Sequence, residues 1–346
     1  MKTAAGLGAG LAGLGGMATQ ARAATSLTYS VWLPPTHALV RDFAVPWSQK
    51  VEEATGGEVK VTIPPKPVTN PAGHLNAART GIVDIVFVSQ SYYPGMFELE
   101  KVFILPFGDP SARITSIASY RIYQKYMAAL KRKEYEGLEL LGTYTHGPGA
   151  VFTNGKVVQD IKDFEGLRIR IGGGMAADVG RLLKVNAVVK PAPESYELLS
   201  TGVVDGVFFP PEAVATFKLD TAIKEATVFP GGLYGDMHSV VMNKKAYDGL
   251  TEAQQQAIRG LSGEVLADMA GNAWGSADTA AMKSLEDHGV QIREASPELV
   301  TDIREAVGGL ELAWRQEAAQ YDLDADAILA DYREELKKVQ NELDAA

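Results

Sequence analysis

The chain has 346 residues, a net charge of −10 and no cysteine. Its length favours two domains, and its acidity argues against nucleic acid and anionic membrane surfaces as partners, although a locally positive site can still hold an anion. The lack of cysteine excludes disulfides, thiolate nucleophiles and cysteine-based zinc or iron–sulfur sites.

The first 23 residues are typical of a secretory signal peptide. Lys2 precedes an uncharged stretch rich in Ala, Gly and Leu, and Ala21-Arg22-Ala23 places small residues at the −3 and −1 positions of a cleavage site. A Gly/Ala tail without a targeting role is the alternative. No later stretch approaches the roughly 20 apolar residues of a membrane span. We therefore predict export to the periplasm.

Strands and helices alternate along the rest of the chain. In order, the pattern predicts a strand at 26–32, a helix at 43–55, strands at 58–63, 138–144 and 167–171, a helix at 175–183, a strand at 238–243, a helical region at 250–285 with a break or two at glycines, and helices from 297 to the end. Such alternation predicts mostly parallel sheets covered by helices.

An internal repeat marks two similar units. Residues 75–88 read LNAARTGIVDIVFV and residues 196–209 read YELLSTGVVDGVFF. In both, an amphipathic helical stretch ends at Thr-Gly, where glycine supplies the left-handed cap, and a buried apolar strand follows. The repeat predicts two lobes of similar construction, with chance resemblance as the alternative.

A ligand of such a sheet would lie beyond the carboxyl ends of its strands. The candidate binding residues at these ends are Trp32 after the first strand, Ser89, Gln90 and Tyr93 after the first repeat, Phe209 after the second, and Arg170 with Gly172 at the end of 167–171. A guanidinium beside a helix N-terminus suits a carboxylate. A surface arginine or an internal ion pair is the alternative for Arg170, and a core role is the alternative for the aromatic residues.

Several segments, taken in order, resemble the DctP family, the extracytoplasmic solute-binding proteins of tripartite ATP-independent periplasmic (TRAP) transporters. The segments are YSVWLPPTHALVRDFAVPWSQKVEEATGGEVKV, RTGIVDIVF, MFELEKVFILPF, VQDIKDFEGLRIR, ESYELLSTGVVDG and VVMNKKAYDGLTEAQQQAI. The resemblance spans nearly the whole mature chain and implies that Arg170 is the family's carboxylate-binding arginine.

The resemblance also implies an α/β, two-lobed periplasmic binding protein fold with crossing hinge strands and a long connecting helix. We expect one lobe from 24–146 plus 235–274 and the other from 147–234 plus 275–346. Lobe closure would seal a small organic acid in the cleft, and the loaded protein would deliver it to TRAP membrane permease subunits. We expect a monomer with no cofactor and no metal.

The chain departs from the family pattern in its expected pocket. Phe209 stands where many members have an asparagine that holds the carboxylate, Gly149 stands where some sugar-acid binders have a second arginine, and Ala192 replaces a pocket aromatic of some members. A pocket with few polar anchors disfavours polyhydroxylated ligands. We therefore predict a monocarboxylate with an apolar or aromatic body. A short dicarboxylate or an oxo acid is the alternative.

The remaining candidate residues of the pocket are His146, Tyr234 and His238. None of the five histidines forms a metal-ligand pair of the HExxH kind, and no catalytic constellation is evident. The acidic run at Asp322, Asp324 and Asp326 lacks the Gly and Glu of a calcium loop and is predicted to cap the last helix. A bilobal enzyme or a sensory module that acts on a small acid remains the alternative class of function.

Overall fold

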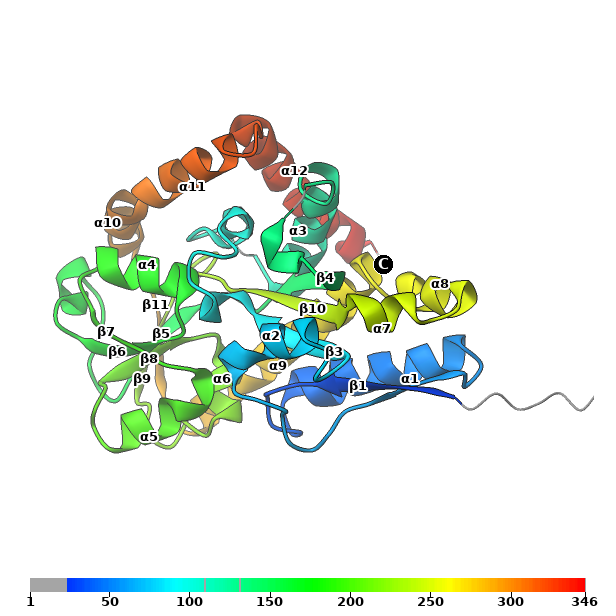
Figure 1. The fold of residues 1–346 in the computed structure, drawn as a ribbon. Coiled ribbons are helices and arrows are strands. Elements are labelled where there is room, and N and C mark those ends of the chain that lie inside the picture. The colour runs from blue at the N-terminus through cyan, green and yellow to red at the C-terminus, as the bar shows by residue number, and fades with distance from the viewer. Residues whose placement is uncertain (1–23, 109, 131, 346) are drawn as a thin grey trace, which may run out of the picture.

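Two mixed β-sheets lie next to each other in the computed structural model, which describes residues 24–108, 110–130 and 132–345 (Figure 1). The predicted signal peptide, residues 1–23, lies outside the described residues. The chain passes from the first sheet to the second between β4 and β5, and it returns between β9 and β10. These passages confirm the predicted architecture of two lobes joined by crossing strands.

The first sheet has five strands. Their order is β2 (Val59–Thr62), β1 (Thr25–Ser30), β3 (Ile85–Ser89), β10 (Met237–Asn243) and β4 (Leu138–Thr145). β1 runs parallel to β2 and β3, whereas β10 runs antiparallel to β3 and β4. The register places His238 opposite Ser89. Every residue of β3 is buried, as its unbroken apolar run predicts.

The second sheet repeats this arrangement and adds one strand. Its order is β11 (Gln291–Glu294), β9 (Glu225–Val228), β5 (Ala150–Thr153), β8 (Gly206–Phe209), β6 (Arg168–Ile171) and β7 (Asn186–Val189). β8 has a parallel neighbour in β6 and an antiparallel neighbour in β5, just as β3 lies between β1 and β10. Gly81 and Gly202, with φ of 75° and 73°, end the helices that precede β3 and β8. The predicted repeat is thereby confirmed.

The prediction of mostly parallel sheets is confirmed, because all strands but one in each sheet run in the same direction. Each sheet receives one strand that arrives from the other lobe, β10 in the first and β5 in the second, and each of these runs antiparallel to both of its neighbours. A chain that crosses between lobes enters the sheet from the cleft side, so its direction opposes that of the local β–α units. The crossing strands therefore make both sheets mixed.

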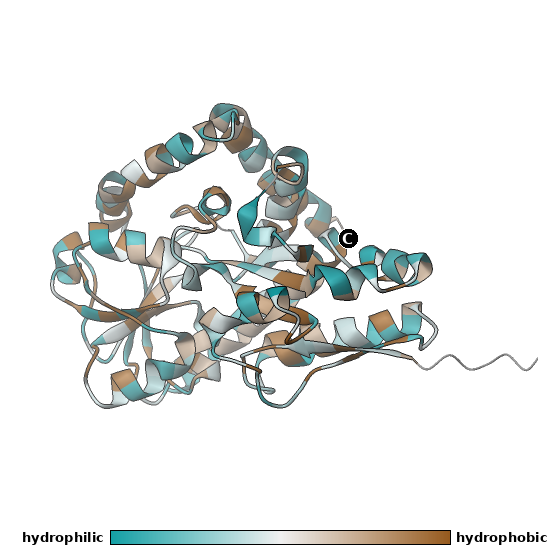
Figure 2. Ribbon diagram, viewed as in Figure 1, coloured by the Kyte–Doolittle hydropathy of each residue, from teal (hydrophilic) through white to brown (hydrophobic). Residues whose placement is uncertain are grey.

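Helices cover the outer faces of both sheets, and hydrophobic and hydrophilic residues alternate along their ribbons (Figure 2). The buried residues of these helices are mainly apolar. Their bounds are α1 (Val45–Ala54), α2 (His74–Arg79), α3 (Ala112–Tyr126), α4 (Gly174–Leu182), α5 (Ser195–Ser200), α6 (Pro211–Thr216), α7 (Lys244–Asp248), α8 (Glu252–Gly260), α9 (Glu264–Asp287), α10 (Pro297–Val307), α11 (Gly309–Ala319) and α12 (Ala325–Asp344). The predicted region 250–285 is thus broken between α8 and α9. Asp324 accepts a hydrogen bond from the Ala327 amide (3.0 Å), which confirms the predicted cap.

The long helix α9 joins the two lobes. It packs against α3 and β4 of the first lobe and against α6 of the second. The last three helices also cross between lobes, because α10 packs on α4 whereas α12 packs on α3 (Figure 1). The predicted lobe boundaries remain a prediction, and this packing favours counting 325–344 with the first lobe. In the described part of the chain, no helix combines the length and the apolar character that a membrane span requires.

Candidate functional site

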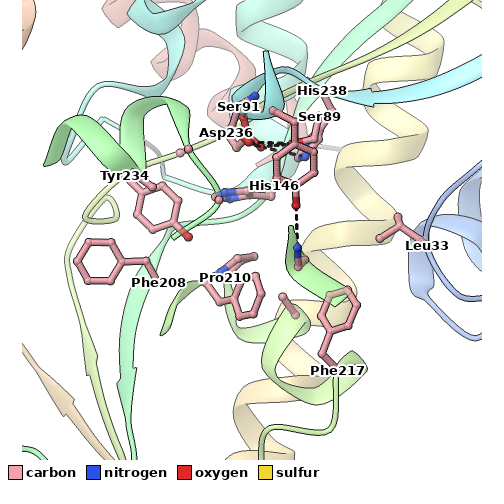
Figure 3. A pocket seen from close by; sticks show the side chains of 18 of the residues that line it. Leu33, Ser89, Ser91, His146, Phe208, Pro210, Phe217, Tyr234, Asp236 and His238 are labelled. Carbon is pink, nitrogen blue, oxygen red and sulfur yellow. Dashed lines mark hydrogen bonds and ion pairs between the residues drawn. The ribbon is translucent and has the colours of Figure 1, made fainter. Parts of the chain in front are cut away.

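A pocket lies where the carboxyl ends of β1, β3, β6 and β8 meet the crossing segments and α9. The space between its atoms, part of which is open to solvent, is about 530 Å³. In Figure 3, Ser89, Ser91, Asp236 and His238 gather at one end of the pocket, and Pro210 and Phe217 lie at the other. The residues that line it are Trp32, Leu33, His37, Ser89, Ser91, Tyr92, His146, Arg170, Gly172, Gly173, Ala176, Ala192, Phe208, Phe209, Pro210, Ala213, Phe217, Tyr234, Gly235, Asp236, His238 and Trp274.

Arg170 is the cation of this pocket. It lies on β6 and is only 2% exposed. Its Nε and Nη2 donate to the backbone carbonyl of Lys190, at 2.9 and 2.6 Å, and its guanidinium carbon lies 4.4 Å from the centre of the Phe209 ring. These contacts fix the guanidinium plane against the pocket wall. They leave its positive charge without a carboxylate partner at ion-pair distance among the described residues.

Burial lowers the pKa of Arg170, and the polar hydroxyls of Tyr92 and Tyr234 and the carboxylate of Asp236 act in the opposite direction. Arginine nevertheless stays protonated in proteins, so the buried charge persists. A buried cation held by a carbonyl, the Tyr92 hydroxyl and a ring, with no anion at ion-pair distance, is costly unless an anion joins it. A ligand carboxylate would supply that anion and accept the guanidinium donors that Lys190 and Tyr92 do not use.

Asp236 organises the polar end of the pocket. Its Oδ2 accepts hydrogen bonds from the hydroxyls of Ser89 (2.6 Å) and Ser91 (2.9 Å), and its Oδ1 accepts from the Ser91 amide (3.3 Å). Nε2 of His238 lies 3.5 Å from Oδ2. Burial raises the pKa of Asp236 to about 6 despite these donors. The cluster joins the short helix Gln90–Tyr92 to the returning hinge segment before β10.

Two of the pocket histidines, His146 and His238, are held neutral by burial. Burial lowers the pKa of His146 to about 4 and takes that of His238 well below its usual value. His37 accepts the Leu39 amide at Nδ1 (3.1 Å), and its Nε2 lies 3.2 Å from Glu212. His146 and His238 therefore offer uncharged ring nitrogens rather than imidazolium cations at neutral pH.

A chain of ring contacts leads from Arg170 around one side of the pocket. Phe209 stacks on Phe217 (5.9 Å between centres), Phe217 contacts His37 (6.5 Å), His37 contacts Trp274 (5.7 Å), and Trp274 stacks on His238 (5.1 Å). The other side runs through Tyr92, Trp32 and Phe87.

On that other side, Trp32 lies 5.7 Å from Tyr92 and 5.3 Å from Phe87, and Phe87 lies 5.2 Å from His238. Both series start beside Arg170 and end at His238. The two series of rings form opposite walls of the pocket, and their flat faces and edges suit an aromatic ring.

Contacts between the lobes close the pocket. The Ala192 amide donates to the Tyr92 hydroxyl (3.0 Å), and Lys101 Nζ lies 2.9 Å from Asp178 Oδ2. The backbone at Gly173 (φ 125°) approaches Ser91 so closely that a Cβ there would lie 2.4 Å from the Ser91 carbonyl oxygen. The structure is therefore the closed form of the two lobes.

The pocket brings together most of the candidate residues named from the sequence: Trp32, Ser89, His146, Arg170, Gly172, Ala192, Phe209, Tyr234 and His238 all line it. Three candidates lie elsewhere. Gln90 donates to the Ser239 hydroxyl (2.8 Å), and Tyr93 donates to the Pro71 carbonyl (3.1 Å), so both point into the first lobe. Gly149 lies behind the pocket wall, where its amide donates to the Tyr234 carbonyl (3.0 Å).

Sequence reasoning missed Asp236 and Trp274. Asp236 lies in the crossing segment between β9 and β10, and no periodic pattern marks such a segment. Trp274 lies in the middle of α9, where an aromatic residue in an Ala-rich helix ordinarily indicates core packing. In the described part of the chain, no three His, Asp or Glu side chains gather as metal ligands.

Comparison with known proteins places the chain among solute-binding proteins. The model of the DctP family, described as bacterial extracellular solute-binding protein, family 7, matches residues 30–316. A curated relative, the outer membrane transporter protein TsaT of Comamonas testosteroni, is 26% identical over 92% of this chain and 93% of its own length.

Two solved structures share the fold at substantial identity. A TRAP periplasmic solute-binding protein from Bordetella bronchiseptica, with bound (R)- and (S)-mandelate, is 50% identical, with a TM-score of 0.89 over 91% of this chain and 99% of that one. A marine metagenome TRAP protein described as specific for aromatic acids, with 3-hydroxybenzoate, is 30% identical, with a TM-score of 0.84 over 92% and 99%.

Proposed function

The chain belongs to family 7 of the bacterial extracellular solute-binding proteins, and we propose that it captures an aromatic monocarboxylate between its lobes and delivers it to the membrane permease of a TRAP transporter. As a member of this family it acts outside the cytoplasm, in the periplasm. Its role is binding and release, without chemical change of the ligand. We also expect it to act as a monomer.

The observation that carries the proposal is the state of Arg170. The guanidinium is 2% exposed, donates to the Lys190 carbonyl and to the Tyr92 hydroxyl, and lies against a phenyl ring in the pocket. A bidentate carboxylate completes the hydrogen bonds of such a group. Among the described residues that line this pocket, Arg170 is the one arginine or lysine, which favours one carboxylate over two.

The walls favour an aromatic body for the ligand. Phe209 and Phe217 lie on one side and Trp32 with Tyr92 on the other, so a ring held by Arg170 meets ring faces and edges. Apolar side chains at Phe209 and Ala192 leave the hydroxyls of a sugar acid without partners there, which costs affinity. The ligands of the two similar solved structures, mandelate and 3-hydroxybenzoate, belong to the proposed class.

A ligand panel tests the proposal. Purified protein, unfolded and refolded to remove carried ligand, is titrated calorimetrically with benzoate, mandelate, succinate and galacturonate. We expect the two aromatic monocarboxylates to bind most tightly. Tightest binding of succinate would favour the dicarboxylate alternative, and tightest binding of galacturonate would reject the aromatic pocket.

A further inference from the structure

Three polar ring atoms in the pocket have no hydrogen-bond partner among the described residues: Nε1 of Trp32, Nε1 of Trp274 and Nδ1 of His238. All three rings line the pocket, with exposures of 9%, 5% and 3%. A buried polar atom without a partner costs stability, so three of them around one small pocket indicate a polar group that arrives with the ligand.

The tautomer of His238 determines whether the incoming polar group must donate or accept a hydrogen bond at this ring. Nε2 of His238 lies 3.5 Å from the Asp236 carboxylate, so the proton of the neutral ring is favoured on Nε2. Nδ1 then carries a lone pair and can only accept. The two indole N–H groups can only donate. A hydroxyl group can donate to Nδ1 and accept from an indole at once, whereas a methoxy group or a halogen cannot donate.

Asp236 itself is a poorer acceptor for such a group. The hydroxyls of Ser89 and Ser91 and the Ser91 amide already donate to its two oxygens. These donors use most of the lone pairs of the carboxylate and leave it to orient His238. Nδ1 of His238 is therefore a free acceptor at this end of the pocket.

The subsite lies apart from the carboxylate anchor. Two separate series of ring contacts, through Phe217 and Trp274 on one side and through Trp32 and Phe87 on the other, run from the neighbourhood of Arg170 to His238. A ligand whose carboxylate contacts Arg170 thus presents its other end to His238.

We propose that His238, together with the indole N–H of Trp274 or Trp32, forms a second subsite that recognises a hydroxyl group on the ligand. The inference rests on the proposed function and narrows it to hydroxylated aromatic monocarboxylates. The hydroxyl is carried on the ring, away from the carboxylate that contacts Arg170.

A double-mutant cycle between ligand and protein tests the subsite. Dissociation constants are measured for phenylacetate, mandelate, 3-hydroxyphenylacetate and 3-methoxyphenylacetate with the wild-type protein and with His238→Phe, which keeps the ring stack on Trp274 but removes the acceptor. With the wild-type protein we expect 3-hydroxyphenylacetate to bind about tenfold or more tightly than phenylacetate, and His238→Phe to abolish that gain in affinity. The methoxy compound, which cannot donate a hydrogen bond, and mandelate, whose hydroxyl lies next to the carboxylate, should show no gain that depends on His238.

Tyr144→Phe is the matched control, because Tyr144 packs on His238 (5.4 Å between ring centres) without lining the pocket. It should leave the hydroxyl gain unchanged. If His238→Phe fails to fold, Trp274→Phe and Trp32→Phe replace it, and one of them should reduce the gain. The subsite would be overturned if the wild-type protein bound 3-hydroxyphenylacetate and phenylacetate with equal affinity. It would also be overturned if the gain in affinity from the hydroxyl survived these substitutions. Failure of all four aromatic acids to bind would instead overturn the proposed function.

Discussion

Replacing Arg170 with methionine removes the guanidinium while keeping most of the length of the side chain. The loss of one partner from a buried, hydrogen-bonded charge pair costs about 2–5 kcal/mol, which corresponds to a rise in Kd of about 30- to 4,000-fold. The low exposure of Arg170 places the expected effect in the upper part of that range. Arg170→Lys keeps the charge but cannot hold both Lys190 and a carboxylate through a planar fork, so we expect a smaller loss.

Isothermal titration with mandelate gives the Kd of each variant. Arg168→Met is the matched control, because Arg168 lies on the same strand but pairs with Asp205 at the surface (2.6 Å). It should bind as the wild-type protein does. Circular dichroism and a cooperative melt of the unliganded Arg170→Met protein establish that it folds. A Kd for that variant within about threefold of the wild-type value would refute the anchor assignment.

Other perturbations test the closed pocket. Burial raises the pKa of Asp236 to about 6, so acidification through that value removes a negative charge that faces the anionic ligand. The affinity for ligand, measured by calorimetry, should therefore rise as pH falls through about 6. Asp236→Asn should flatten this dependence of affinity on pH. Gly173→Ala should prevent closure of the lobes, because the added Cβ would lie 2.4 Å from the Ser91 carbonyl oxygen. Small-angle scattering should then show no compaction of the variant when ligand is added. Compaction of the variant equal to that of the wild-type protein would contradict this expectation. Lys101→Met removes a partly buried ion pair with Asp178 that is worth about 1 kcal/mol or less. Stopped-flow measurements should therefore show ligand release accelerated by up to about fivefold. A change confined to the association rate would contradict a role of this pair in closure.

The repeat in the sequence made the two-lobed fold predictable. A helix, a Thr-Gly cap and an apolar strand are all encoded locally, so residues 75–88 and 196–209 could be assigned from residue pattern alone. The shared direction of most strands was also predictable, but the one antiparallel strand in each sheet was not. The direction of that strand depends on where the chain crosses between lobes, and the short segments before β5 and β10 carry no periodic signal.

The site was predictable where it follows a strand. Arg170 and Phe209 lie at the carboxyl ends of buried strands, where ligands of such sheets bind, and both line the pocket. Gln90 and Tyr93 also follow a strand, but the chain turns there into a short helix that directs them into the first lobe. Asp236 reaches the pocket from a crossing segment, so its place depends on tertiary structure that the local sequence does not encode.

A crystal structure of the protein with a bound aromatic monocarboxylate tests the central claim most directly. We expect both carboxylate oxygens within hydrogen-bonding distance of the Arg170 guanidinium and the ligand ring between Phe209 and Trp32. A ligand whose carboxylate is bound elsewhere in the cleft, with Arg170 still bonded only to Lys190 and Tyr92, would contradict the claim.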